Sequence, residues 1–192
     1  MSSNVDGRPT VLVVDDEEAV ADVLALKIRE HYETRVVYGG EAALDAMDET
    51  IDAVLLDRRM PDVHGDDVLS EIREQGYDCA VIMTTAVDPD LNILEMDFDD
   101  YLSKPIETET LLTALDQQID TRASSDPRLE EFFSLVSKLE VLESELTPAE
   151  LARSDEYETR KREAEALGRE LQESHQDFEE IVEIFRDIGR NS

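Results

Sequence analysis

The chain has 192 residues, 41% of them hydrophobic, which is enough for one domain of ordinary size and a smaller second one. No apolar stretch approaches the roughly 20 residues of a membrane-spanning helix, and the polar start of the chain lacks the pattern of a signal peptide. The single cysteine, Cys79, excludes an internal disulfide framework. A cytoplasmic protein without a membrane segment is therefore expected.

The formal net charge of −31 is extreme for a folded protein. Acidic excess of this size is typical of disordered chains and of nucleic-acid mimics, but the regular apolar pattern described below argues against disorder. A halophilic cytoplasm is the preferred explanation, because molar salt screens the repulsion between charges over roughly 3 Å. On this interpretation the charge reflects the habitat of the protein and not its partner.

The first two thirds of the chain alternate short apolar runs with amphipathic stretches, the pattern of βα units around a parallel sheet. The first, third and fourth strands are rich in Val, Leu and Ile, so they are expected to be buried on both faces. The predicted strands are 10–14, 34–38, 53–56, 80–84 and 101–103, and the predicted helices are 18–30, 40–47, 65–74, a short one near 89–95, and 107–120.

A small, polar segment that ends in a proline, residues 121–127, has the composition of a linker. It divides the chain into an α/β domain, residues 1–120, and a helical domain, residues 128–192. After it, apolar residues recur at spacings of three and four and share one helical face: Leu129, Phe132, Val136, Leu139, Leu142 and Leu146.

A new helix is predicted after this face, because Thr147, Pro148 and Glu150 supply an N-cap, a proline in the first turn and a capping-box carboxylate. Gly168 and residues 174–177 are places where that helix could be split. A coiled-coil-like stripe follows, with Tyr157, Ala164, Leu171, Phe178 and Phe185 at intervals of seven and with Leu167, Ile181 and Ile188 beside them. The stripe can be buried in a helical hairpin or in a homodimer, and the sequence leaves both open.

Carboxylates follow two of the predicted strands. Asp15 and Asp16 come after the first strand and Asp57 after the third, so they are expected at the sheet edge where doubly wound folds place ligands. Such close charges repel unless a cation shares them, and hard oxygen ligands suit Mg2+, although Mn2+ also fits. An Asp pair alone could simply cap a helix. Here Thr85 and Lys104 end two further strands, and both are useful in phosphoryl transfer.

The motifs VLVVDDE, LLDRRMPDVHG, TTA and YLSKP resemble, in order and spacing, the receiver domain of two-component response regulators. The resemblance covers roughly residues 9–120 and implies a flavodoxin-like, doubly wound (βα)5 fold with a five-stranded parallel sheet, like the chemotaxis receiver. It implies that Asp57 is the phosphoacceptor. It also implies that Asp15, Asp16, Asp57 and the backbone carbonyl of Arg59 bind Mg2+.

The same resemblance implies that Thr85 is the switch hydroxyl, Tyr101 the switch aromatic and Lys104 the phosphate-pairing lysine. The implied partner is a sensor histidine kinase. The implied chemistry is limited to self-phosphorylation and autodephosphorylation, so the protein is not expected to be an enzyme. Elementary chemistry agrees, because a carboxylate can form an acyl phosphate and an inward move of Thr85 would make room for Tyr101.

The C-terminal segment resembles the HalX domain found behind receivers in salt-loving archaea, through the run LTPAELARSDEY. This implies a helical output for transcription regulation. Residues 121–192 hold 10 Lys and Arg against 19 Asp and Glu, so the charge does not support DNA binding. A switch that binds a partner protein or itself is therefore favoured over a receiver driving a DNA-binding output. An unrelated hydrolase is disfavoured, because no Gly-rich phosphate loop or His–Cys pair accompanies the carboxylates.

Overall fold

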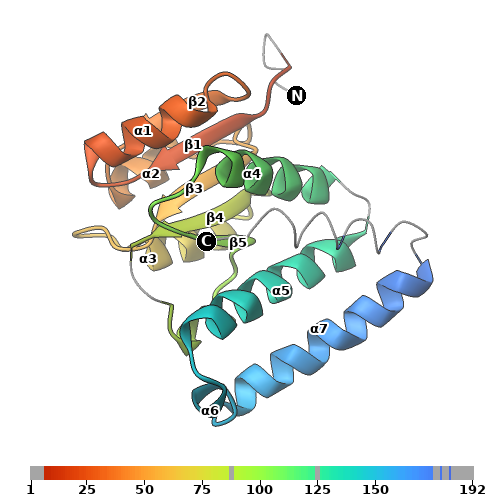
Figure 1. Cartoon of the computed structure of the whole chain (residues 1–192). Coiled ribbons are helices and arrows are strands. Elements are labelled where there is room, and N and C mark those ends of the chain that lie inside the picture. Colours follow the sequence, from red (N-terminus) through yellow and green to blue (C-terminus); the bar gives the residue numbers. More distant parts are fainter. Residues whose placement is uncertain (1–6, 87–88, 124–125, 175–177, 179–181, 183–192) are drawn as a thin grey trace.

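A computed structural model of the chain describes residues 7–86, 89–123, 126–174, 178 and 182 (Figure 1). Its core is a five-stranded parallel sheet in the order β2-β1-β3-β4-β5. This is the predicted doubly wound fold. The strands are β1 Thr10–Val14, β2 Glu33–Val37, β3 Ala53–Asp57, β4 Ala80–Thr85 and β5 Asp100–Ser103, and the helices are α1 Glu18–Ile28, α2 Gly40–Ala46, α3 Gly65–Glu74, the 3-10 helix η1 Leu91–Glu95, α4 Thr108–Ala123, α5 Pro127–Glu145, α6 Pro148–Leu151 and α7 Asp155–Ser174.

The central strands β1, β3 and β4 are buried along their whole length, as their Val, Leu and Ile content predicts. Alternate side chains point to opposite faces of the sheet. Val11 and Val13 join the apolar cluster under α1 and α4, whereas Leu12 and Val14 join the cluster on the other face. Since β3 and β4 each run one residue further than expected, Asp57 and Thr85 are the last residues of their strands.

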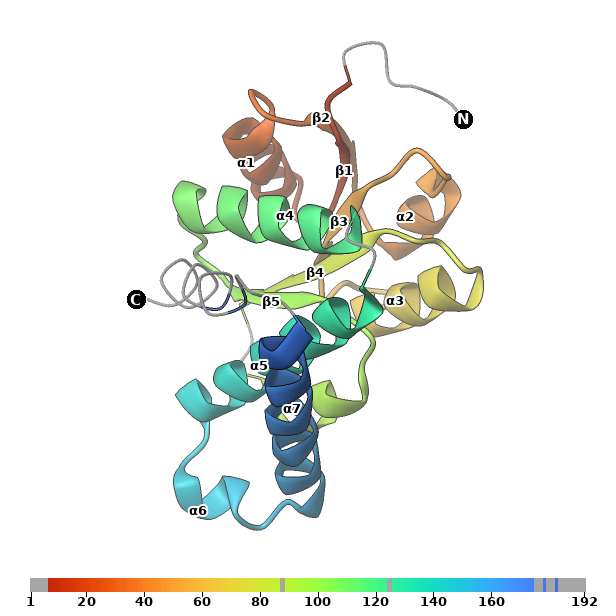
Figure 2. The same ribbon diagram turned by 90° about the vertical axis from the view of Figure 1, so that its right-hand side faces the viewer.

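Helices cover both faces of the sheet (Figure 2). One layer consists of α1 and α4, and the other of α2, α3 and α5. The segment between β4 and β5 contributes only the short η1 among the residues that the structure describes, near the short helix that the sequence predicts there. The sheet face over β5 is covered instead by α5, whose Leu135 and Leu139 belong to the same apolar core as Phe98 and Tyr101.

Within the expected linker, residues 121–127, the described residues 121–123 and 127 are helical, so the predicted bounds of the linker are corrected. Helix α4 continues to Ala123, and α5 begins at Pro127 with Asp126 as its N-cap. Residues 124–125 lie outside the described residues. Arg122 holds this last part of α4 in place: its guanidinium donates to the buried Asp99 at 2.7 Å and to the exposed Asp78 at 2.8 Å.

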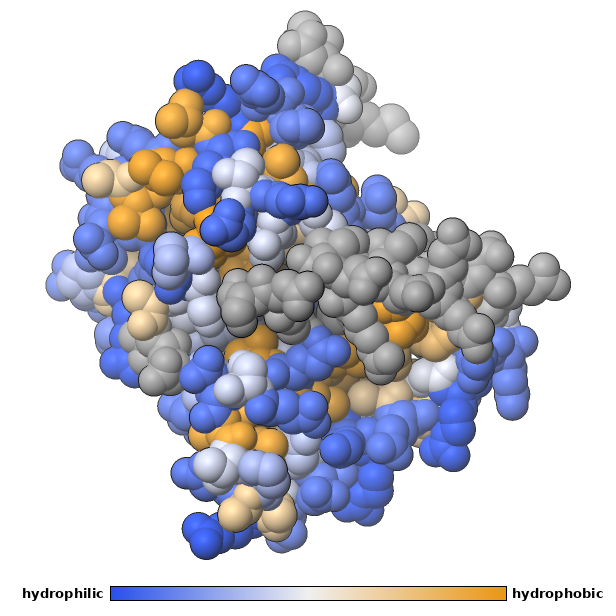
Figure 3. All heavy atoms as spheres, in the orientation of Figure 1, coloured by the Kyte–Doolittle hydropathy of each residue, from blue (hydrophilic) through white to orange (hydrophobic). Residues whose placement is uncertain are grey.

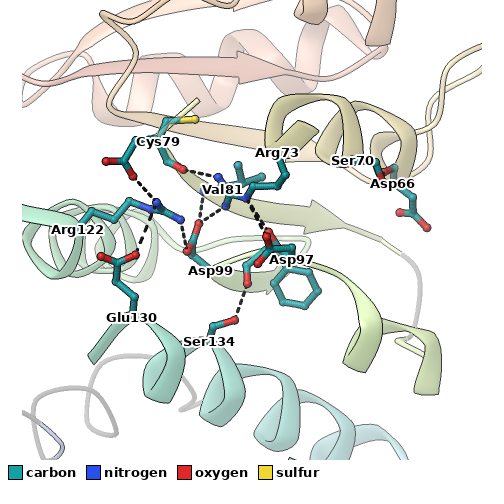
Figure 4. A network of polar contacts seen from close by, with 12 residues as sticks. Asp66, Ser70, Arg73, Cys79, Val81, Asp97, Asp99, Arg122, Glu130 and Ser134 are labelled. Atoms are coloured by element: carbon teal, nitrogen blue, oxygen red, sulfur yellow. Dashed lines mark hydrogen bonds and ion pairs between the residues drawn. The ribbon is translucent and has the colours of Figure 1, made fainter. Parts of the chain in front are cut away.

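Asp99 is the centre of this polar network (Figure 4). Its carboxylate accepts hydrogen bonds from Arg73 of α3 and Arg122 of α4, both at 2.7 Å, and from the backbone N–H of Val81 at 2.6 Å. Arg122 also pairs with Glu130 of α5 at 3.7 Å. The network joins three helices at the edge of the sheet where β4 and β5 begin.

The C-terminal helices form a hairpin, because α7 runs back along α5 (Figures 1 and 2). The predicted capping box before α6 is confirmed, with the N–H of Thr147 donating to Glu150 at 2.9 Å. Gly168 does not split α7 but lies inside it, against the ring of Phe132. The described residues of the heptad stripe are buried within the chain, namely Tyr157, Ala164, Leu171 and Phe178. Phe185, Ile181 and Ile188 lie outside the described residues.

Helix α5 is buried on more than the one face that the apolar spacing predicts. Phe133, Ser137 and Val141 are buried at intervals of four, beside the predicted stripe. One side of α5 packs on α7 and the other on the sheet. Most of the visible surface is hydrophilic (Figure 3), as the acidic composition requires. Among the described residues, no helix combines the length and the apolar character needed to cross a bilayer.

Candidate functional site

Asp57 ends β3 at the carboxyl edge of the sheet and is 6% exposed. Its Oδ2 accepts a hydrogen bond from the backbone N–H of Arg59 at 2.8 Å. The loop then returns, and the N–H of Gly65 donates to the carbonyl of Arg58 at 3.0 Å. A Cβ on Gly65 would lie 2.2 Å from the backbone oxygen of Asp57, so only glycine fits this close approach.

Lys104 brings two of the predicted carboxylates together. Its ammonium donates to Asp15 at 2.5 Å and also to Asp57. Asp15 is 1% exposed. Lys104 follows β5, and its backbone N–H donates to the carbonyl of Thr85 at 2.7 Å, which extends the pairing of β4 with β5 to the site. The Lys104–Pro105 peptide bond is cis.

Asp16 is not gathered into this cluster. Its side chain is exposed, whereas Asp15 and Asp57 are buried. Within the part of the chain that the structure describes, no three His, Cys, Asp or Glu side chains form a ready metal-binding group. The structure thus joins Asp15, Asp57 and Lys104. It leaves Asp16, the third predicted carboxylate, at the surface.

Burial and nearby charges shift the pKa values of Asp57 and Lys104. Burial raises the pKa of Asp57, and the charge of Asp15 acts in the same direction, while the hydrogen bond and charge of Lys104 oppose them. Burial alone would lower the pKa of Lys104, but its hydrogen bonds to Asp15 and Asp57 and their charges raise it overall. Lys104 therefore remains an ammonium ion between the two carboxyl groups.

The predicted switch residues also meet. Thr85 and Tyr101 are 1% and 3% exposed, and the Tyr101 hydroxyl is hydrogen-bonded to the side chains of Thr85 and Arg58. Arg58 is buried and donates to Asp66 of α3 at 3.0 Å. The residue pattern does not single out Arg58, because an arginine after a strand is usually a solvated surface charge. The available signal was Asp66, a carboxylate in the first turn of the next helix.

The donor set fits a hard divalent cation. Asp15 and Asp57 place two buried carboxylates at one sheet edge, and only one ammonium, that of Lys104, lies between them. Carboxylate and carbonyl oxygens with room for water suit Mg2+. The backbone carbonyl of Arg59 and the exposed Asp16 stay predicted ligands.

Comparison with known families agrees with this geometry. The family model described as "Response regulator receiver domain" matches residues 11–116, which is more than half of the chain. The chain belongs to the response regulator receiver family. Behind this receiver, the model described as "HalX domain" matches residues 121–188. The receiver and HalX resemblances drawn from the sequence are therefore confirmed.

Known relatives match parts of this chain. A protein of Haloferax volcanii named "Putative transcriptional regulator" is 47% identical over 135 residues, which are 70% of this chain and 23% of the relative. The chain thus spans about a quarter of that protein. The receiver domain from Clostridium thermocellum is 29% identical with a TM-score of 0.56, covering 60% of this chain and 97% of that one. A CheY-like receiver from Methanospirillum hungatei JF-1 shares the fold at 24% identity, with a TM-score of 0.57 and coverages of 60% and 97%.

Proposed function

We propose that this receiver accepts a phosphoryl group on Asp57 from a sensor histidine kinase, and that the acyl phosphate switches its C-terminal helices. The observation that carries this proposal is that the ammonium of Lys104 pairs with the buried carboxylates of both Asp15 and Asp57. Positioning and charge neutralisation are the main requirements of phosphoryl transfer, and this edge of the sheet supplies both.

In the proposed step an oxygen of Asp57 attacks the phosphorus of a phosphohistidine. The new P–O bond forms as the P–N bond breaks, and the histidine nitrogen leaves with the electron pair. Lys104 is placed to donate to a phosphoryl oxygen. Thr85 can donate its hydroxyl to another, which would take that hydroxyl from Tyr101. Asp15, Asp16, Asp57 and the carbonyl of Arg59 would hold Mg2+, which when bound neutralises the phosphoryl charge.

The proposed output is regulation of transcription through protein contacts. The name of the Haloferax volcanii relative and the match to the HalX domain support regulation. Direct DNA binding is less well supported, because basic residues of α7 already have acidic partners. Arg160 pairs with Glu163 at 3.0 Å, and Lys161 lies 3.6 Å from Glu143. Phosphate contacts are also weakened steeply by high salt.

Acetyl phosphate labelling tests the proposed site. The full chain with Mg2+ should gain one phosphoryl group by intact mass, and Asp57→Asn should gain none. Asp62→Asn is the matched control, because Asp62 is exposed in the adjoining loop at φ 68°, which asparagine tolerates. Label retained in Asp57→Asn, or lost in Asp62→Asn alone, would contradict the assignment.

A further inference from the structure

Helix α5 belongs to the C-terminal segment, yet it serves as a layer of the receiver. The described chain between β4 and β5 supplies only η1, which leaves the sheet face over β5 for another element. Helix α5 lies along β5 (Figures 1 and 2). Its Leu135, Leu139 and Leu142 share one apolar core with Phe98 and Tyr101. The first helix of the output therefore packs directly against the strand that carries the switch aromatic.

Polar contacts fix α5 on this face at particular residues. Ser134 donates to the carbonyl of Phe98 at 2.7 Å, as Figure 4 shows, and Ser137 donates to the carboxylate of Asp100. Ser137 is fully buried and Asp100 is 6% exposed. Lys138 places its ammonium 4.9 Å from the centre of the Phe98 ring. A buried hydrogen bond to a carboxylate depends strongly on geometry, so it reports small shifts of β5.

These contacts reach the phosphoacceptor site in few steps. Oδ1 of Asp100 accepts both the hydroxyl of Ser137 and the backbone N–H of Tyr101, the latter at 2.8 Å. The Tyr101 hydroxyl is hydrogen-bonded to Thr85. The carbonyl of Thr85 in turn accepts the N–H of Lys104, whose ammonium holds Asp57. One unbroken series of hydrogen bonds and covalent neighbours thus runs from Asp57 to α5.

We propose that α5 is the element that the receiver switches, and that Ser137 is the positioning residue that couples it to the phosphoacceptor site through Asp100. This inference rests on the proposed function of Asp57. When the hydroxyl of Thr85 turns to a phosphoryl group on Asp57, Tyr101 loses one hydrogen-bond partner. Lys104, which follows β5, moves toward the phosphoryl group and shifts the end of that strand. Oδ1 of Asp100, which accepts hydrogen bonds from both Tyr101 and Ser137, then changes position, and α5 must change its docking on β5. Helix α7 follows, because it packs on the opposite side of α5.

Linkage gives this coupling a measurable consequence at the site itself. If a phosphoryl mimic at the site changes the docking of α5 by some factor, then the docking of α5 changes the affinity for the mimic by the same factor, so a variant with weakened docking must shift that affinity. A typical coupling between two sites corresponds to a change of about fivefold or more in affinity. A merely structural serine would alter stability without altering the affinity for a phosphoryl mimic.

The test uses the full chain and beryllofluoride with Mg2+ as the phosphoryl mimic. In the wild type, the mimic should change hydrogen exchange in residues 127–145. Ser137→Ala should remove most of that response and shift the affinity for the mimic by about fivefold. Ser144→Ala is the control on the same helix, because Ser144 hydrogen-bonds only the carbonyl of Val141 among the contacts described. It should match the wild type.

The outcomes separate the inference from the function beneath it. Binding of the mimic with unchanged exchange in residues 127–145 overturns the inference and leaves the function standing. Absence of both mimic binding and acetyl phosphate labelling overturns the two together. If Ser137→Ala fails to fold, Ser137→Cys keeps the size with a weaker donor and should shift the affinity in the same sense, by less. Wild-type affinity in the folded variant contradicts the role of Ser137.

Discussion

The ammonium of Lys104 is hydrogen-bonded to the carboxylate of Asp57, 47 residues earlier in the sequence. The same ammonium serves Asp15, so one positive charge compensates two buried negative charges. This arrangement neutralises the site only in part. It also leaves an excess of negative charge that a divalent cation can relieve.

Replacing this ammonium should destabilise the receiver. In Lys104→Met the two carboxylates lose their shared partner, and we expect a loss of about 2–4 kcal/mol in the free energy of unfolding, less than for a fully buried pair because Lys104 is partly exposed. Added Mg2+ should stabilise this variant more than the wild type. Urea unfolding at constant salt measures both effects. Lys27→Met is the control, because Lys27 donates to the carbonyl of Ile106. If Mg2+ stabilised Lys104→Met and the wild type equally, this explanation would be contradicted.

Gly65 should not tolerate a side chain. A Cβ would lie 2.2 Å from the oxygen of Asp57 and 2.8 Å from the Cα of Arg58, and both are backbone atoms. We expect Gly65→Ala to cost about 1–3 kcal/mol and to slow acetyl phosphate labelling, because Asp57 must shift. Gly168→Ala is the contrast: its Cβ meets only the flexible ring of Phe132 at 3.1 Å, and alanine favours the helix. Equal stability of the two variants would count against the close approach.

Lys138 should make stability depend on pH. Burial lowers its pKa to about 8 from 10.5, although Asp97 and Asp99 oppose this. Below about pH 8 the folded protein must bury the charge, and between about 8 and 10.5 the unfolded chain binds more protons, so this contribution to stability rises with pH.

Lys138→Met removes this dependence. The variant should be more stable than the wild type near neutral pH, by on the order of 1–3 kcal/mol, and the difference should shrink as the pH rises above 8. Chemical unfolding of both proteins across this range measures the difference. Lys161→Met should show no such trend, because the Lys161 side chain is about half exposed and Tyr157 raises its pKa instead of lowering it. A gap that stays constant with pH would refute the assignment.

The receiver should depend on α5 for its stability. A fragment that ends at Ala123 lacks the leucines of α5, so Phe98 and Tyr101 lose their cover. We expect this fragment to unfold at lower urea than the full chain and to bind a hydrophobic dye, because burial is worth about 25 cal/mol per Å2 of apolar surface. An unfolding midpoint equal to that of the full chain would show that residues 1–120 form an independent domain.

Local pattern was sufficient for the α/β part of the fold. The Val- and Leu-rich runs located the central strands within one or two residues, because a buried strand leaves a continuous apolar signature. The strand ends then placed Asp15, Asp57, Thr85 and Lys104 at one edge of the sheet, since parallel strands share an end. The sequence could not place Asp16, because its exposure depends on how the chain turns after β1.

The cover of β5 was decided only by the tertiary structure. Ser137 and Lys138 are polar and are expected in solvent from their residue types, yet they are buried against Asp100 of β5 and against Phe98 just before that strand. Arg122 falls in the predicted linker for a similar reason, because a polar residue in a small polar segment is expected in solvent. Its hydrogen bonds to Asp99 and Asp78 instead hold it in α4. Sequence by itself determined the periodicity of each element and the chemistry at the strand ends. Which helix lies on which sheet face depended on contacts between residues far apart in the chain, whose energies local spacing does not encode.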